Sequence, residues 1–351
     1  MPEAAEARTA VGIKALGQDE LLWLVESLDQ PAYRANQLVR WLYGRRATSF
    51  DEMTDLPVKL RETLEERFAI PRPTLVERQV SEVDETRKYL WRLADGVEVE
   101  SVGLPANGRL TVCFSTQAGC AMRCSFCATG RSGFVRDLFC GEMTDQVALV
   151  GEDFGTRVSN AVAMGQGEPF ANYDAVLEGL RIMNSPLGLG IGARHLTVST
   201  CGLTSGIRRF ADEPEQFTLA VSLHSAVQAT RDHLMPGVRA VALPVLRRSL
   251  DDYALKTGRR PTLEYALIDG VNDTDEELEA LVGFCRGLLC HVNLIPANPV
   301  PGTGVTRATA ERVREFERVL DRSWIETSVR EERGTDIDAA CGQLRQRRVA
   351  D

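Results

Sequence analysis

The chain has 351 residues, of which 44% are hydrophobic and 26% charged, a composition typical of a globular protein with one large domain, or one large and one small. Residues 1–20 lack the apolar stretch of a signal peptide and no run of 18 apolar residues occurs, so we expect neither export nor membrane insertion, and place the protein in the cytoplasm. Nine cysteines in so long a chain favour ligand or catalytic thiols over disulfides.

The net charge of −9 argues against a nucleic-acid partner. That argument is weak, because phosphate binding depends on the charges near the binding site and not on the net charge of the protein. Residues 101–136 contain no Asp or Glu, and they include Arg109, Arg123, Arg131 and Arg136. This stretch is either a basic island in an acidic protein or a chance cluster of arginines.

Residues 1–72 are predicted to form a small helical domain, because apolar residues recur at spacings of three and four over 19–26 and 33–43. Tyr33, Arg34 and neighbouring cations would suit nucleic acid, since rings and positive charge together bind bases and phosphates. A solvated helix face with core aromatics fits this segment equally well.

Residues 73–105 show strand-like alternation on both sides of Asp95-Gly96, which predicts a β-hairpin around a tight turn. We expect this hairpin to connect the helical domain to the rest of the chain.

Residues 106–345 are predicted to form the main domain, with short apolar strands alternating with amphipathic helices such as 143–154, 173–184 and 275–288. The six expected strands are 110–116, 158–165, 195–200, 217–223, 262–268 and 291–296. This alternation of strands and helices predicts a parallel α/β architecture, either a doubly wound sheet or a complete or partial barrel. In each of these, the active site lies beyond the carboxyl ends of the strands.

Three cysteines, Cys120, Cys124 and Cys127, follow the first of these strands. Structural zinc takes four closed ligands, whereas an iron–sulfur cluster held by three thiolates leaves one iron open for chemistry. The spacing favours such a cluster over a partial zinc site or three buried thiols. Polar motifs at other strand ends would face the same point: Gly165–Pro169, Ser199–Gly202, Ser222–His224 and Pro296–Pro299.

The Cys-x3-Cys-x2-Cys motif after the first strand of a β/α repeat resembles that of the radical S-adenosylmethionine (SAM) superfamily. Within it, nearly the whole chain resembles the RlmN/Cfr family of RNA adenine methyltransferases. The resemblance rests on the stretches 111–120, 126–130, 167–169, 263–265, 269–273 and 330–344.

The resemblance implies an α/β fold with a partial (β/α)6 barrel, and a function in methylating C2 of an adenine in 23S ribosomal RNA, near the peptidyl-transferase centre, and in transfer RNA. It assigns a [4Fe-4S] cluster to Cys120, Cys124 and Cys127. The residues it assigns to SAM binding are Gly167, Glu168, Ser199, Ser222, Leu223, His224 and Asn298.

The resemblance also implies a route through Cys341, which one SAM molecule methylates while a second is cleaved to a radical that activates the S-methyl group. Glu100 would accept the C2 proton, and Cys113 would attack the Cys341 sulfur, releasing product and leaving a transient disulfide. The implied partners are a flavodoxin-type electron donor and a disulfide reductant, and we expect a monomer. Without the resemblance, the sequence would predict a solvated carboxylate on the hairpin for Glu100 and a core histidine for His224.

The other four cysteines, Cys140, Cys201, Cys285 and Cys290, match no family role and are expected to be small buried side chains. Val238 stands where relatives commonly carry Asn, which affects local loop contacts. Two other functions remain open: C8 methylation of adenine, which shares every motif above, and a different radical SAM or iron–sulfur protein such as a glycyl-radical activase.

Overall fold

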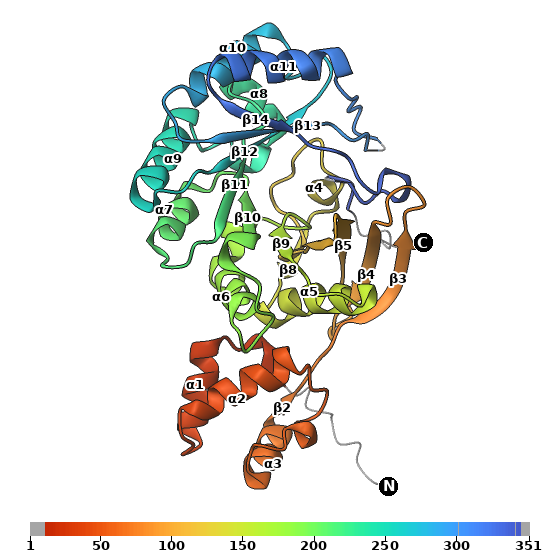
Figure 1. Cartoon of the computed structure of the whole chain (residues 1–351), viewed down its shortest axis with the longest axis vertical. Coiled ribbons are helices and arrows are strands. Elements are labelled where there is room, and N and C mark those ends of the chain that lie inside the picture. Colours follow the sequence, from red (N-terminus) through yellow and green to blue (C-terminus); the bar gives the residue numbers. More distant parts are fainter. Residues whose placement is uncertain (1–10, 301, 341, 345–351) are drawn as a thin grey trace.

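The computed structural model describes residues 11–300, 302–340 and 342–344, and only the backbone of residue 11. A small helical unit at the N-terminus sits at one end of a larger α/β unit (Figure 1). In the part of the chain so described, no helix is both long and apolar enough to cross a membrane.

The described residues of the N-terminal unit form three short α-helices, and the strands β1 (Val11–Gly12) and β2 (Phe68–Ala69) pair in parallel across its ends. Its helices are α1 (Gln18–Ser27), α2 (Tyr33–Val39), which continues into a π-helical turn, and α3 (Val58–Arg67). Helices this short depend on packing, and a common core that includes Leu21, Leu38 and Leu42 supplies it. The two predicted helices are thus observed.

The helical unit is joined to the larger unit through α5 (Cys140–Phe154) and α6 (Tyr173–Asn184). Cys140 and Ile182 from these helices belong to the core of the N-terminal unit. Lys14 Nζ also lies 2.7 Å from Asp145 Oδ1, and both side chains are buried. Shared core and buried charge together fix the N-terminal unit to the outer helices of the sheet.

The larger unit is built on one ten-stranded sheet with the order β14-β13-β12-β11-β10-β9-β6-β5-β4-β3. Its parallel strands are β6 (Arg109–Cys113), β9 (Asn160–Ala163), β10 (Leu196–Thr200), β11 (Thr218–Ser222), β12 (Thr262–Leu267), β13 (His291–Pro296) and β14 (Glu326–Val329). The six predicted strands are confirmed, and β14 adds one that was not predicted.

The predicted hairpin is present as β4 (Arg87–Arg92) and β5 (Glu98–Ala106), with Gly96 in its turn at φ +86°. It is more than a connection, because β5 pairs antiparallel with β6 and so extends the main sheet. β3 (Thr74–Val80) pairs with β4 at the edge, and the register shifts between Leu75 and Glu77.

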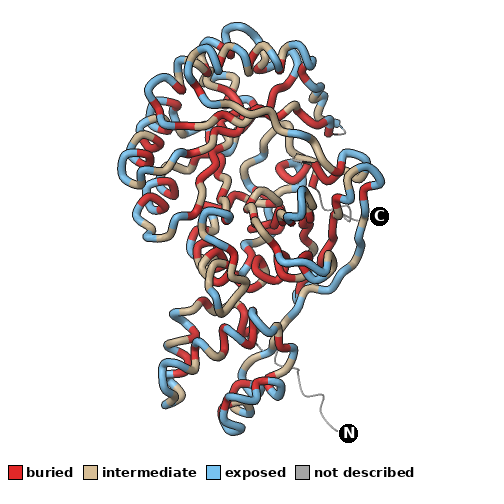
Figure 2. Tube along the Cα trace, in the orientation of Figure 1, coloured by how far each residue is buried: buried red, intermediate tan, exposed pale blue. Residues whose placement is uncertain are grey.

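Helices cover the outer face of the parallel strands (Figure 1), and Figure 2 shows the buried residues concentrated in the strands and on the helix faces turned toward them. These helices are α5, α6, α7 (Thr204–Asp212), α8 (Gln228–Leu234), α9 (Leu243–Thr257), α10 (Asp275–Cys285) and α11 (Ala310–Arg322). A short hairpin of β7 (Gln117–Gly119) and β8 (Phe134–Asp137) encloses α4 (Ala128–Ser132). The cysteine loop lies between β7 and α4.

Candidate active site

The cysteine loop is held in place by backbone contacts on both sides. Cys120 N donates to Gly133 O at 2.8 Å, and Ser125 N donates to Leu234 O at 2.9 Å, just after α8. Gly119 has φ +74°, and a Cβ there would lie 1.9 Å from Gly133 O, so only glycine fits. The loop therefore has one backbone path, which sets the positions of its thiols.

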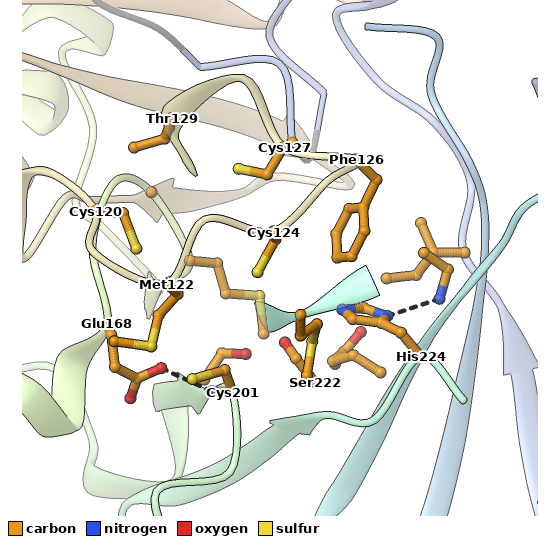
Figure 3. Close-up of a pocket in the computed structure, with 18 of the residues that line it drawn as sticks. Cys120, Met122, Cys124, Phe126, Cys127, Thr129, Glu168, Cys201, Ser222 and His224 are labelled. Carbon is orange, nitrogen blue, oxygen red and sulfur yellow. Dashed lines mark hydrogen bonds between the residues drawn. The ribbon is translucent and has the colours of Figure 1, made fainter. Parts of the chain in front are cut away.

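Cys120, Cys124 and Cys127 all line one cavity at the carboxyl ends of the parallel strands (Figure 3). Burial raises the pKa of Cys120 to about 11 and the pKa of Cys124 well above its usual range. A buried thiolate needs positive charge beside it. Bound iron supplies that charge, and a thiol that coordinates the metal loses its proton. Three thiols around one cavity, one buried and two partly buried, thus fit an iron–sulfur cluster. Within the described residues, no three Cys, His, Asp or Glu side chains converge closely enough to hold a single metal ion.

Glu168 lies in the wall of this cavity, with a buried carboxylate whose orientation is fixed. Its Oε1 accepts from Thr200 Oγ1 at 2.6 Å and from Phe170 N at 3.0 Å, and its Oε2 accepts from Cys201 N at 2.7 Å. Burial raises its pKa, and these hydrogen bonds oppose the rise. A carboxylate held this way suits an ammonium group entering the cavity.

Gly167 brings Glu168 to that position. It has φ +106°, and a Cβ there would lie 2.7 Å from Gln117 N, so the turn packs directly against β7. Gln117 Oε1 also accepts from Glu168 N at 2.8 Å. The Gly-Glu pair is thus placed by its contact with the strand that leads into the cysteine loop.

His224 lines the cavity from the end of β11 and is buried. Its Nδ1 accepts from Ala266 N at 3.0 Å, so the interpretation of His224 as a core histidine is correct. Its ring also faces Phe126 edge-on, with the ring centroids 4.8 Å apart. Burial lowers the pKa of His224 to about 3, so the ring is neutral and carries its proton on Nε2.

Ser199, Ser222 and Asn298 also line the cavity, as the strand-end motifs predicted. Leu223 does not line it: the side chain is fully buried in the main core, and its backbone N donates to Glu264 O at 3.0 Å. Leu223 therefore shapes the strand end through its backbone.

A second cavity adjoins the first, and Met164, Ile295, Asn298 and Arg330 line both. Cys113, the last residue of β6, lines the second cavity and pairs across the sheet with Val102 of β5. The thiol of Cys113 is thus separated from the cysteine loop by a shared wall.

Glu100 is buried and lies on the same sheet face as Val102 and Cys113, because residues two apart in a strand point the same way. Its carboxylate faces Lys88 Nζ at 4.0 Å, and Lys88 also donates to Asp338 O at 3.2 Å. The interpretation of Glu100 as a solvated carboxylate was wrong: Glu100 is buried on a strand that has a neighbour on each side, and Ala339 and Leu344 pack against Val102 and Cys113 next to it.

Cys341 lies outside the described residues. Its described neighbours lie at the two cavities: Ala340 lines the second, and Gly342 lines the first. Gly342 O accepts from Ala128 N at 2.8 Å, and Leu344 O accepts from Thr129 Oγ1 at 2.6 Å. The segment that follows Cys341 is therefore docked on α4, next to the cysteine loop.

Cys201, Glu264 and Arg330 are among the residues of the cavity wall that had no predicted role. Cys201 is buried as expected, but its backbone holds Glu168. Arg330 directly follows β14, the strand that was missed, and only its place in a family motif could have marked it. Val238 is buried in an apolar cluster with Met235 and Leu234, packed against Met122 and Cys124, so an apolar side chain is accommodated there.

Comparisons with known proteins agree with this geometry. Residues 12–70 match the family described as ribosomal RNA large subunit methyltransferase N-terminal domain, and residues 114–284 match the Radical SAM superfamily. A protein of Thermoanaerobacter sp. (strain X514) named "Probable dual-specificity RNA methyltransferase RlmN" is 45% identical over 95% of this chain and 98% of its own length.

A protein of the same name from Pelotomaculum thermopropionicum is 47% identical over 96% of this chain and 92% of its own length. The crystal structure of a radical SAM methyltransferase from Sphaerobacter thermophilus superposes with a TM-score of 0.88 at 44% identity, covering 95% of this chain and 99% of the other. Both the sequence and the fold are thus matched over nearly the whole length.

Proposed function

Because the chain belongs to the RlmN family of radical SAM dual-specificity RNA methyltransferases, we propose that it methylates C2 of an adenine in 23S ribosomal RNA, near the peptidyl-transferase centre, and of an adenine in transfer RNA. The observation that carries the proposal is the pair of adjoining cavities, one lined by the three loop cysteines and the other by Cys113, with the flanks of Cys341 at both.

Cys120, Cys124 and Cys127 would hold a [4Fe-4S] cluster, and Gly167, Glu168, Ser199, Ser222, His224 and Asn298 would hold SAM, with Leu223 contributing backbone. When bound, these groups supply the methyl group and the one-electron chemistry that the electron-poor C2 carbon requires. Glu168 would orient the cofactor's ammonium group, and neutral His224 would donate from Nε2 without adding charge. The apolar wall formed by Met122, Phe126 and Met235 would exclude water.

Cys341 would carry the methyl group as S-methylcysteine, using one SAM molecule for this transfer and a second for activation. After the methyl carbon has bonded to the adenine, the Cys113 thiolate would attack the Cys341 sulfur. The S–S bond forms as the bond from sulfur to the transferred carbon breaks, and that carbon keeps the electron pair and takes a proton. An external thiol reductant must then supply two electrons to the disulfide.

Glu100 would accept the C2 proton. It shares a sheet face with Cys113, and the ion pair with Lys88 would hold its carboxylate in position.

The RNA would enter with its adenine unstacked into the second cavity, while the helical N-terminal unit holds the backbone as a second contact. A flavodoxin-type protein would supply the electron. We propose that the enzyme acts as a monomer in the cytoplasm, where both RNA substrates are found.

The test is mass spectrometry of digested ribosomal and transfer RNA from cells with and without the gene. Loss of 2-methyladenosine supports the proposal. Loss of 8-methyladenosine instead would assign the alternative C8 reaction, which uses the same two thiols. No change in either would point to a different radical SAM reaction.

A further inference from the structure

Three cations are buried among the described residues, and they differ in their partners. Lys14 pairs with Asp145, and Lys88 pairs with Glu100. Arg231, on α8, has no described carboxylate as an ion-pair partner, although it has no exposed surface. Its Nε and Nη1 atoms also have no hydrogen-bond partner in the described structure. A buried charge normally has compensation, so this arginine requires an explanation.

The guanidinium lies directly behind the wall of the cysteine cavity. Its Nη2 donates to Cys201 O at 2.7 Å, and Cys201 lines that cavity. Cys201 also belongs to an apolar cluster against which Cys124 of the cysteine loop packs. Arg231 itself does not line the cavity, and Cys201 lies between its guanidinium and the cavity.

The helix that carries Arg231 is attached to the cysteine loop. Ser125 N donates to Leu234 O at 2.9 Å at the end of α8, and Gly237 N donates to Met122 O at 2.9 Å just beyond it. A Cβ on Gly237 would lie 2.6 Å from Met122 Cα, so the two segments are in backbone contact. The position of the guanidinium relative to Cys124 is therefore fixed.

A cluster held by three thiolates carries net negative charge and gains another on reduction. A fixed cation near a buried cluster stabilises the reduced form of the cluster more than the oxidised form, because Coulomb interactions are weakly screened inside a protein. Glu168 adds further negative charge to the same cavity. The described residues contribute one buried cation at this place, Arg231.

We propose that Arg231 is a positioning residue that acts through Cys124, and that its buried guanidinium is the built-in counter-charge that makes the cluster easier to reduce. This inference rests on the proposed function only in placing the cluster at Cys120, Cys124 and Cys127. It adds a role for a residue that lines neither cavity.

The experiment compares the wild type with Arg231→Met, Arg231→Lys and the control Arg181→Gln, all as full-length protein reconstituted without oxygen. Arg181 lies on α6 and bonds Glu213 and Glu215, none of which lines the cavity. Each sample is titrated with a redox mediator set, and the reduced cluster is measured by electron paramagnetic resonance. At the wild-type midpoint, Arg231→Met is expected to lower the reduced-to-oxidised ratio by about threefold or more, and Arg231→Lys by less. Arg181→Gln should titrate like the wild type.

A second measurement covers the case in which a variant binds its cluster poorly: the Tm of thermal unfolding, with and without the cluster. Met fills the space without a charge, so in cluster-free protein Arg231→Met should be neutral or stabilising, whereas in loaded protein it should lower Tm. Equal loss of Tm in both forms would show that Arg231 only supports the Cys201 carbonyl, and would overturn the proposal. So would a wild-type midpoint in loaded Arg231→Met. If the wild type itself binds no iron, the assignment of the cluster fails instead.

Discussion

Lys88 Nζ and Glu100 Oε1 face each other at 4.0 Å on neighbouring strands of a sheet, with both side chains buried. Two residues further along β5, Val102 stands opposite Cys113. The proposed base and the proposed resolving thiol are thus set on one rigid surface, and their spacing is determined by strand register.

Replacing Glu100 with Gln is expected to slow methylation by about 10²- to 10⁴-fold, the usual contribution of a general base. Gln keeps the shape but cannot take a proton. Methylation of Cys341 should persist, because it does not use this group. Single-turnover assays with labelled SAM measure both steps, and Glu98→Gln, on the same strand with its side chain bonded to Arg92, is the matched control. Wild-type turnover in Glu100→Gln would place the base elsewhere.

Replacing Cys113 with Ala should trap RNA on the protein, since release requires a thiol to attack the Cys341 sulfur. Gel electrophoresis under denaturing conditions would reveal a band sensitive to both ribonuclease and protease. Cys290→Ala removes another buried cysteine, outside both cavities, and should give free product. Recovery of only free, methylated RNA from Cys113→Ala would refute the release step.

Replacing Gly119 with Ala should deprive the loop of its cluster. The new Cβ would lie 1.9 Å from Gly133 O, so the backbone before Cys120 must shift. We expect iron content to fall to less than about half. Gly96→Ala is the matched control: it has a similar positive φ, but a Cβ there would meet nothing within 4 Å, so it should cost about 1 to 2 kcal/mol in backbone strain and keep its iron. Equal iron loss in both variants would attribute the effect to strain alone.

Replacing Lys14 with Met leaves Asp145 buried without its cation, which should destabilise the protein by about 3 to 5 kcal/mol. The double variant Lys14→Met, Asp145→Leu removes both charges and should recover most of this loss. Urea unfolding of the wild type, Lys14→Met, Asp145→Leu and the double variant gives the coupling energy. If the single and double variants are equally unstable, the ion pair is not what holds the two units together.

His224 should make stability depend on pH. Its folded pKa, about 3, lies below the ordinary value near 6.5, so between these values the unfolded chain binds the proton and the folded chain does not. Stability therefore falls as pH drops through this window, by at most about 1.4 kcal/mol per pH unit from this residue. His224→Gln should flatten the slope between pH 6 and 4, as measured by urea unfolding, whereas replacing exposed His233 should not. An unchanged slope would mean that His224 is protonated in the folded protein.

Features whose signal lies within a few consecutive residues could be predicted from the sequence. The cysteine spacing, the apolar runs of the six strands and the Asp95-Gly96 turn are each contained in a few consecutive residues, and the structure shows the cysteine loop at one cavity, the strands and the turn. β14 was missed because Glu326-Thr327-Ser328-Val329 has a single apolar residue, and it forms a strand only because β13 offers it a free edge.

Long-range contacts could not be predicted. Nothing near Glu100 in the sequence indicates that it is buried, and its partner Lys88 meets Asp338, 250 positions later in the sequence, only in the folded chain. The same holds for Arg231, whose α8 periodicity gives no sign that its side chain is buried beside Cys201. These positions are set by packing of elements far apart in sequence.

The register shift in β3 between Leu75 and Glu77 has a consequence for handling the purified protein. β3 is the last strand of the sheet, and an unpaired strand edge can recruit another chain and start aggregation. The irregular backbone, together with charged Glu77 and Arg78, interrupts the regular row of donors and acceptors that such recruitment needs. The β3 edge is thus a poor template for an intermolecular sheet.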